Sequence, residues 1–431
     1  MKISGARMAL LLYLYISFML VGGGIVLSAW IAFHYGGTGL VGWILIFTSG
    51  STLVLAPVAG HIVDKHDRCG AAAVGQALRA AGFLALALPE LDIHGISACV
   101  TLTASGAMGT FGFSLQMGAI NALARINVAA PDSAKLSFQM SLAKQIGIAS
   151  GTGLAGLSID KCGPSATALF LSVLALCAAS CLGLIRFPGA GAPVVKSKLG
   201  LFGASRQALE YLRGDPEALT GTISVGLAFA IIQTTNLLLP GFVVNRLEGS
   251  TSLFGALEMI AATAGFVAVV ISASTSSAER LRQGVVPLLV AAGLSLVLFS
   301  IAKQKVTAIA LYALVGVLWS LSRAAADAAL LTFVEIGFIG RVQALTTLVT
   351  AAVGAVVYSL PTIFVKLTEA QLYALCGSVI AVSAACLLLF GRSAGESCCL
   401  ARRAGKRKDE RGLDAENQIR TSAGNQTRLD S

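Results

Sequence analysis

The chain has 431 residues, of which 56% are apolar and only 12% are charged, and its mean hydropathy is +0.81. A water-soluble protein carries about twice that share of charged residues. It also could not bury so much apolar surface, because the fraction buried on folding levels off as chains grow longer. The composition therefore excludes a soluble enzyme, a disordered scaffold and a secreted disulfide-rich domain, and it predicts an integral membrane protein.

The net charge of +10 comes from 31 Lys and Arg residues against 21 Asp and Glu residues. Most basic residues stand in short gaps between apolar runs, and aromatic residues are not interleaved with them. This placement is typical of topology signals in membrane proteins rather than of a nucleic-acid-binding surface. The nine cysteines show no repeating spacing, so the sequence predicts neither a disulfide framework nor a metal site.

Twelve apolar runs are long enough to cross the hydrocarbon core, which takes about 20 helical residues. They cover residues 8–34, 39–60, 71–89, 96–124, 136–158, 164–186, 218–245, 252–274, 284–301, 306–333, 342–365 and 369–391. The sequence thus predicts an all-α membrane protein with twelve transmembrane helices.

The gaps between these runs divide the chain into four parts. The longest internal gap separates an N-terminal six-helix half, residues 1–186, from a C-terminal six-helix half, residues 218–391. We expect the gap itself, residues 187–217, to be a cytoplasmic central loop. Residues 392–431 mix nine basic with six acidic residues and few apolar ones, so we expect a disordered cytoplasmic tail.

Basic residues are distributed unevenly between the two sides of the predicted bundle. If the N-terminus is cytoplasmic, 23 Lys and Arg residues face the cytoplasm, 5 face the other side, and Arg79, Lys144 and Arg323 lie within spans. An excess of this kind on one side marks the cytoplasmic face. Both termini are therefore predicted to be cytoplasmic.

The two predicted halves contain a similar segment. LVGWILIFTSGSTLVLAPVAG from Leu40 is similar to LFGALEMIAATAGFVAVVISA from Leu253, at a shift of 213 residues, and Gly42 aligns with Gly255. Two six-span halves related by an internal repeat are the plan of many secondary transporters.

The loop after the second run reads GHIVDKHDR. Its Gly60, Asp64, Lys65 and Arg68 resemble the cytoplasmic loop signature of the major facilitator superfamily. Asp67 stands where many members have Gly, and this variant is similar to the branch that contains enterobactin exporters and macrolide efflux pumps. The resemblance covers about residues 8–391.

The residues of this signature can be explained physically. Gly60 would permit close helix approach, and Asp64 could face helix N-termini and basic neighbours as a latch that closes the cytoplasmic side. We therefore predict a conformational gate at Gly60, Asp64, Lys65 and Arg68. The alternative is that the two basic residues only set topology.

The fifth run contains GIASGTGLAG. Gly151, Gly153 and Gly156 match a dinucleotide-binding string, but that motif requires a preceding strand, and this one lies in the middle of an apolar span. Gly147, Gly151 and Gly156 instead resemble the glycine-rich fifth-span motif of facilitator antiporters, which favours export. The alternative is that these glycines only allow tight helix packing.

Ionisable and amide side chains inside spans are candidates for a substrate or proton pathway, because their burial in a membrane is costly. The resemblance implies that the first, fourth, seventh and tenth spans line the cavity. The alternative for Arg323 and Asp327 is a structural ion pair that neutralises itself. The alternative for the amide residues is that they form interhelical hydrogen bonds. The candidate residues are Glu258, Arg323, Asp327, Gln233, Asn236, Gln116 and Asn121.

Together these features predict a secondary active transporter in a bacterial inner membrane. We expect proton-coupled efflux of a small amphipathic molecule, a siderophore or a drug, by a monomer whose partners are substrate, protons and the lipid bilayer. No nucleotide-binding motif or catalytic set is present, so we expect no enzyme activity, no cofactor, no metal and no nucleic-acid partner. The alternatives are an importer of a small solute and a transport-inactive membrane sensor or assembly protein.

Overall fold

A computed structural model describes most of the chain, and all its regular elements are helices. The described residues are 3–88, 96–127, 133–184, 209–213, 215–275, 284–334 and 339–387. Most of the predicted central loop and the whole predicted tail lie outside these ranges.

The N-terminal half consists of α1 (Ile3–Lys65), α2 (Arg68–Ala87), α3 (Ile96–Asn127) and α4 (Ser133–Leu184). The first and last of these helices are interrupted by non-helical glycines. Gly37 in α1 has φ 62°, and Gly163 in α4 has φ 85°, where side chains other than glycine are strained. Each of the two long helices therefore consists of two helical segments joined at a glycine.

The described residues of the C-terminal half form the helices that follow. They are α6 (Pro216–Asn245), α7 (Thr251–Thr275), α9 (Val285–Ser300), α10 (Lys305–Phe333), α11 (Ile339–Ile363) and a last helix, Glu369–Leu387. Pro240 and Pro361 lie inside helices of this half.

The helices have the length and surface of membrane spans. Among the described residues, nine helices are long and apolar enough to cross a membrane, and Val285–Ser300 is a shorter apolar helix. Many large apolar side chains point outward, with Val306 78% and Val54 70% exposed. Such an apolar exterior would be unfavourable in water and is expected where lipid surrounds the protein. The chain is therefore a multi-pass membrane protein.

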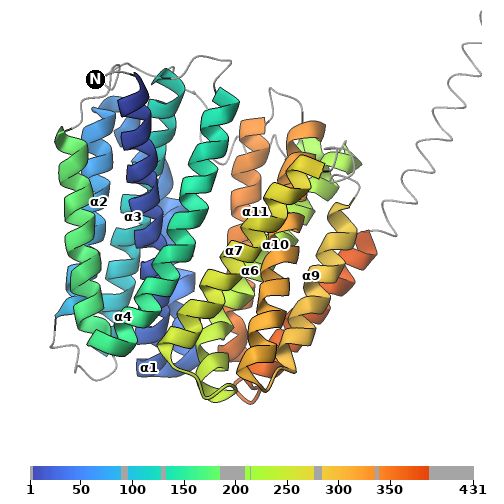
Figure 1. Ribbon diagram of the computed structural model, residues 1–431. Coiled ribbons are helices and arrows are strands. Elements are labelled where there is room, and N and C mark those ends of the chain that lie inside the picture. The colour runs from blue at the N-terminus through green and yellow to red at the C-terminus, as the bar shows by residue number, and fades with distance from the viewer. Residues whose placement is uncertain are drawn as a thin grey trace, which may run out of the picture.

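Figure 1 shows two groups of helices that lie close together at one end and diverge toward the other. We call the end with Lys65 and Arg68 the proximal end, and the end with Gly37, Gly163 and the turn after Asn245 the distal end. Between the halves, α1 contacts α6 and α11, and α4 contacts α7.

The hydrophobic cores follow the same division. The largest cluster of buried side chains joins both halves, with Leu27 and Val41 of α1 in the same cluster as Leu237 and Phe242 of α6. A second cluster lies within the N-terminal half, and a small third cluster joins Leu212 of the predicted central loop to buried residues of the C-terminal half. In this conformation the two halves therefore share one core toward the distal end and have separate cores toward the proximal end.

Candidate functional site

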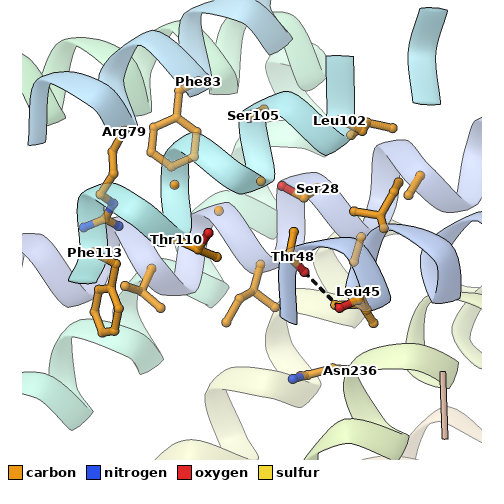
Figure 2. A pocket seen from close by; sticks show the side chains of 18 of the residues that line it. Ser28, Leu45, Thr48, Arg79, Phe83, Leu102, Ser105, Thr110, Phe113 and Asn236 are labelled. Carbon is orange, nitrogen blue, oxygen red and sulfur yellow. Dashed lines mark hydrogen bonds between the residues drawn. The ribbon is translucent and has the colours of Figure 1, made fainter. Parts of the chain in front are cut away.

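A cavity of about 420 Å³ lies on the side of the N-terminal half that faces the C-terminal half. Residues of α1, α2 and α3 form most of its wall, and Asn236 of α6 closes it from the other half (Figure 2). The wall is mainly apolar, with Phe83 and Phe113 among its larger side chains. This size and composition are usual for sites that bind small organic molecules.

The polar end of the cavity is formed by Arg79 of α2. Its side chain is 4% exposed, and its Nη1 donates hydrogen bonds to Gln116 Oε1 at 3.1 Å and to the backbone oxygen of Ser17 at 3.2 Å. Gln76 Nε2 in turn donates to Ser17 Oγ at 2.7 Å. A backbone carbonyl of α1 and the amide side chains of Gln76 in α2 and Gln116 in α3 thus hold the guanidinium in place.

Hydroxyl groups line the rest of the cavity, and most of them donate to their own helix. Thr48 donates to Leu45 O and Thr110 donates to Ala107 O, as Ser and Thr side chains in helices commonly do. Thr52, Ser105 and Ser114 also donate to backbone carbonyls. These oxygens can therefore accept, but not readily donate, a hydrogen bond to a bound molecule.

The predicted amide residues separate into different environments. Gln116 is fully buried behind Arg79, and Asn236 lines the cavity. Gln233 does not line the cavity, since its Nε2 donates to Thr350 O of α11 at 2.9 Å. The side chain of Asn121 lies outside the described set.

Glu258 of α7 lies in the C-terminal half, away from the cavity wall. The hydroxyl of Tyr312 in α10 donates to its Oε1 at 2.8 Å, and the Tyr312 ring packs 5.0 Å from the Phe299 ring. No basic partner of Glu258 is found among the described residues. The carboxyl group is therefore held by a tyrosine beside an aromatic cluster and not by a cation.

Arg323 and Asp327 form an ion pair on α10. The Nε–Oδ2 distance is 2.7 Å, with side chains 28% and 45% exposed. The guanidinium of Arg323 also lies 4.0 Å from the centre of the Phe229 ring of α6. The spacing of four residues does place both groups on one face, and the pair connects α10 to α6 through this cation–π contact.

The glycines of the fifth predicted span lie where helices meet. A Cβ on Gly147 would lie 2.5 Å from Tyr15 O of α1, and a Cβ on Gly151 would overlap Met19 O. A Cβ on Gly156 would lie 2.9 Å from the Cα of Gly255 in α7. The motif therefore allows α4 to pack against α1 and, across the two halves, against α7.

The loop signature lies at the proximal end between α1 and α2. Lys65 is exposed at the end of α1, and Arg68 is 2% exposed at the start of α2, where Asp67 accepts a hydrogen bond from Gly70 N at 2.7 Å. A Cβ on Gly60 would have no neighbour within 4 Å, so the close approach expected there is not seen in this conformation. The side chain of Asp64 lies outside the described set.

Sequence reasoning noted Arg79 as a basic residue within a span but did not place it in the pathway. The sequence did indicate a role for Arg79, because an arginine within a membrane span is costly unless it has a partner or a function. The hydroxyls of the cavity gave no such signal, since Ser and Thr are common in transmembrane helices.

A bundle of apolar helices in two halves, with a cavity between them, defines a membrane transporter. The sequence profile of the Major Facilitator Superfamily matches residues 9–359, and the chain belongs to this family. It is a transporter and not an enzyme. A comparison with curated proteins gives no match.

Solved structures show the same fold at low sequence identity. One is a POT family transporter in complex with 5-aminolevulinic acid, with a TM-score of 0.73, 13% identity, and coverage of 90% of this chain and 96% of that chain. Another is a peptide transporter POT in complex with alafosfalin, with a TM-score of 0.69, 16% identity, and coverage of 91% and 95%. At these identities the likeness establishes the fold alone.

Proposed function

We propose that this protein is a secondary active transporter that exports a small amphipathic molecule in exchange for protons. The observation that carries the proposal is the mainly apolar cavity of about 420 Å³ between the two halves, closed by Asn236 from the opposite half. A site placed between two halves becomes accessible from either side when one half rocks against the other. The shared core at one end and the separate cores at the other support such a rocking motion.

The proposed topology has twelve spans in two halves of six, with both termini in the cytoplasm of a bacterial cell. The nine long apolar helices found among the described residues support this arrangement, because α1 and α4 each contain two segments, and Val285–Ser300 adds a shorter one. The excess of basic residues expected on the cytoplasmic side assigns the proximal end to the cytoplasm. The conformation described here would then be the one that opens inward.

Export is favoured by the antiporter-like glycines and by the loop signature, both of which resemble efflux members of the family. Import of a small solute remains the alternative, and the solved structures of similar fold fit it as well. A transport-inactive sensor or assembly protein is the alternative from another class.

Proton coupling is proposed through an intramembrane carboxylate. Glu258 has a tyrosine as its hydrogen-bond partner, whereas Asp327 is ion-paired with Arg323. The ion pair commits the Asp327 carboxylate to Arg323, whereas the Glu258 carboxyl group has no basic partner among the described residues. Glu258 is therefore the stronger candidate for the proton carrier.

The test uses purified protein in liposomes loaded with a pH-sensitive dye. A panel of siderophores and macrolides is added, and we expect at least one compound to drive proton movement that protein-free liposomes do not show. Dependence of the compound's accumulation on an imposed pH step would establish coupling. Export and import are then distinguished in cells by comparing retention of that compound in a deletion strain and its parent. Absence of flux for the whole panel would favour the sensor.

A further inference from the structure

We propose that Arg79 forms an anion subsite in the cavity, so that the transported molecule is an amphipathic organic anion whose carboxylate binds this guanidinium. The inference rests on the proposed function, since it names the chemical class of that function's substrate. It differs from the sequence-based expectation, which assigned the pathway to other residues.

The first argument is charge. Among the described residues no carboxylate forms an ion pair with Arg79, whose hydrogen bonds run to the backbone oxygen of Ser17 and to the amide oxygens of Gln76 and Gln116. A cation that is 4% exposed within a membrane span loses its hydration, and neutral acceptors replace only part of it. An anionic ligand would supply the missing charge.

The second argument is the direction of the available hydrogen bonds. The wall hydroxyls of Thr48, Thr52, Ser105, Thr110 and Ser114 donate to backbone carbonyls and so present acceptors to the cavity. Hydrogen-bond donors are available at the Arg79 end of the cavity. Arg79 lines the cavity, and Gln116 Nε2 is a buried donor beside it without a partner. An oxyanion placed at Arg79 would therefore meet donors, one of them charged, whereas an oxyanion beside these five hydroxyls would face acceptors.

The third argument is the shape of the remaining cavity. Phe83 and Phe113 lie near Arg79, as Figure 2 shows, and the wall continues through aliphatic residues such as Leu102 and Leu45. An apolar ligand body fits this wall, and its carboxylate would lie at the Arg79 end. An arginine fork binds a carboxylate through two parallel hydrogen bonds, which fixes the ligand's orientation as well as adding affinity. The geometry thus specifies an apolar molecule with a terminal carboxylate.

The test compares carboxylates with their primary amides, which have almost the same shape but no charge. The probes are 1-naphthylacetate, 4-phenylbutyrate and indole-3-propionate with the three corresponding amides, and the readout is the thermal stability of the purified full-length protein at pH 7. We expect at least one carboxylate to raise the Tm in a saturable way, with an apparent affinity at least tenfold above that of its amide. If no carboxylate stabilises the protein, or if amides do so equally, the proposal is wrong.

Two variants assign the effect to Arg79. Arg79→Gln should remove the preference for carboxylates, whereas Arg246→Gln, which removes an exposed arginine outside the cavity, should retain it. Gln116→Glu keeps the arginine and places a carboxylate at its hydrogen-bond partner. This variant should remain folded and should lose carboxylate binding, because the internal carboxylate occupies the subsite. Retained carboxylate binding in Gln116→Glu would overturn the proposal even if Arg79→Gln does not fold.

Binding and transport are measured separately, so the two proposals can fail separately. Carboxylate-selective binding without flux in liposomes would contradict the transport function and leave the anion subsite in place. Proton-coupled flux of an uncharged or cationic compound that is unaffected by Arg79→Gln would support transport and overturn the subsite.

Discussion

Thr38 and Thr251 occupy equivalent positions in the two halves, 213 residues apart, and each donates a hydrogen bond to a carboxylate of the opposite half. Thr38 Oγ1 donates to Glu369 Oε1 at 2.8 Å, and the backbone N–H of Thr251 donates to Asp160 Oδ1 at 3.1 Å. Asp160 Oδ2 also accepts from the backbone N–H of Ser252 at 3.1 Å. A carboxylate at a helix N-terminus satisfies otherwise unpaired donors and interacts favourably with the helix dipole.

These contacts join the two halves at the distal end, along two seams: one where α1 meets α11 and the last helix, and one where α4 meets α7. The repeat found in the sequence places Gly42 and Gly255 at the same two seams. A Cβ on Gly42 would overlap Tyr358 O of α11, and a Cβ on Gly255 would lie 2.9 Å from the Cα of Gly156 in α4. Each seam therefore combines a glycine contact inside the bundle with a carboxylate contact at its edge, and we infer that both must separate when the distal side opens.

Asp160→Ala should favour the state that is open at the distal end. Two hydrogen bonds are lost, but the side chain is exposed, so the expected shift is about 1 kcal/mol, or about fivefold in the ratio of the two states. The measurement is the distance distribution between spin labels at Cys162 and Glu248, two exposed positions next to this contact, in a background without the other cysteines. The matched control is Lys161→Ala, the exposed neighbouring residue, which should leave the distribution unchanged. An unchanged distribution in Asp160→Ala would show that this contact does not hold the seam.

Gly255→Ala should destabilise the protein and impair transport. The new Cβ would lie 2.5 Å from Thr152 O, which is backbone and cannot move without displacing α4. Overpacking of this kind costs roughly 1–3 kcal/mol, so we expect a lower Tm for the purified protein. Gly50→Ala is the matched control, because its Cβ would meet nothing within 4 Å and alanine favours a helix. Equal Tm values for the two variants would contradict the tight α4–α7 seam.

Much of the fold follows from the sequence for physical reasons. Apolar runs of about 20 residues predict spans because hydrocarbon thickness fixes helix length, and the described helices follow those runs. The internal repeat aligned Gly42 with Gly255, and the structure shows that both lie where helices of opposite halves approach closely. The number of spans is harder to derive, since α1 and α4 are each continuous apart from a glycine break.

The cavity could be predicted only in part. Asn236 and Gln116 were candidates because amides inside spans need partners, and one lines the cavity while the other supports Arg79. Gln233 was a candidate for the same reason, but its amide bonds α11. Sequence spacing shows which residues share a helix face, but it does not show which neighbouring helix that face meets. That depends on the tilt and rotation of helices, which packing sets.

Asp64→Asn should impair transport while membrane insertion remains intact. The loop between α1 and α2 needs only basic residues for topology, so an acidic residue there is expected to act in closing the proximal side. Transport should fall at least tenfold, measured as flux per amount of protein in the membrane. Asp67→Asn is a suitable control, because asparagine can also accept the hydrogen bond from Gly70 N at the start of α2. A wild-type rate in Asp64→Asn would exclude the latch.

The arrangement of the proximal end in the described conformation indicates when the loop would make its closing contacts. Gly60 has open space around it, and the halves have separate cores near this end. We therefore expect the loop residues to make their closing contacts only in the opposite state. Crosslinking between the loop and the C-terminal half should increase when substrate and a pH step drive the protein through its cycle, and it should not increase in Asp64→Asn.

Glu258→Gln should abolish uphill, pH-driven movement of substrate and leave downhill exchange intact. The chain has no nucleotide-binding motif, so uphill movement must draw on an ion gradient. Glu258 accepts a hydrogen bond from Tyr312 at 2.8 Å and has no basic partner among the described residues, whereas the Asp327 carboxylate is ion-paired with Arg323 at 2.7 Å. Glutamine can retain the hydrogen bond to the tyrosine but cannot bind and release a proton, so folding should be preserved while coupling is lost.

Two further variants separate coupling from opening of the cavity. Asp327→Asn should leave pH-driven accumulation in place if Glu258 is the carrier, and Arg323→Ala should slow both uphill and downhill movement, because it removes the contact of α10 with Phe229. The measurement is substrate flux in liposomes with an imposed pH step, compared with counterflow at equal pH. Loss of accumulation in Asp327→Asn alone would identify Asp327, and not Glu258, as the proton carrier. If both carboxylate variants keep full pH-driven accumulation, neither group carries the proton, and transport is coupled to sodium or runs downhill without coupling.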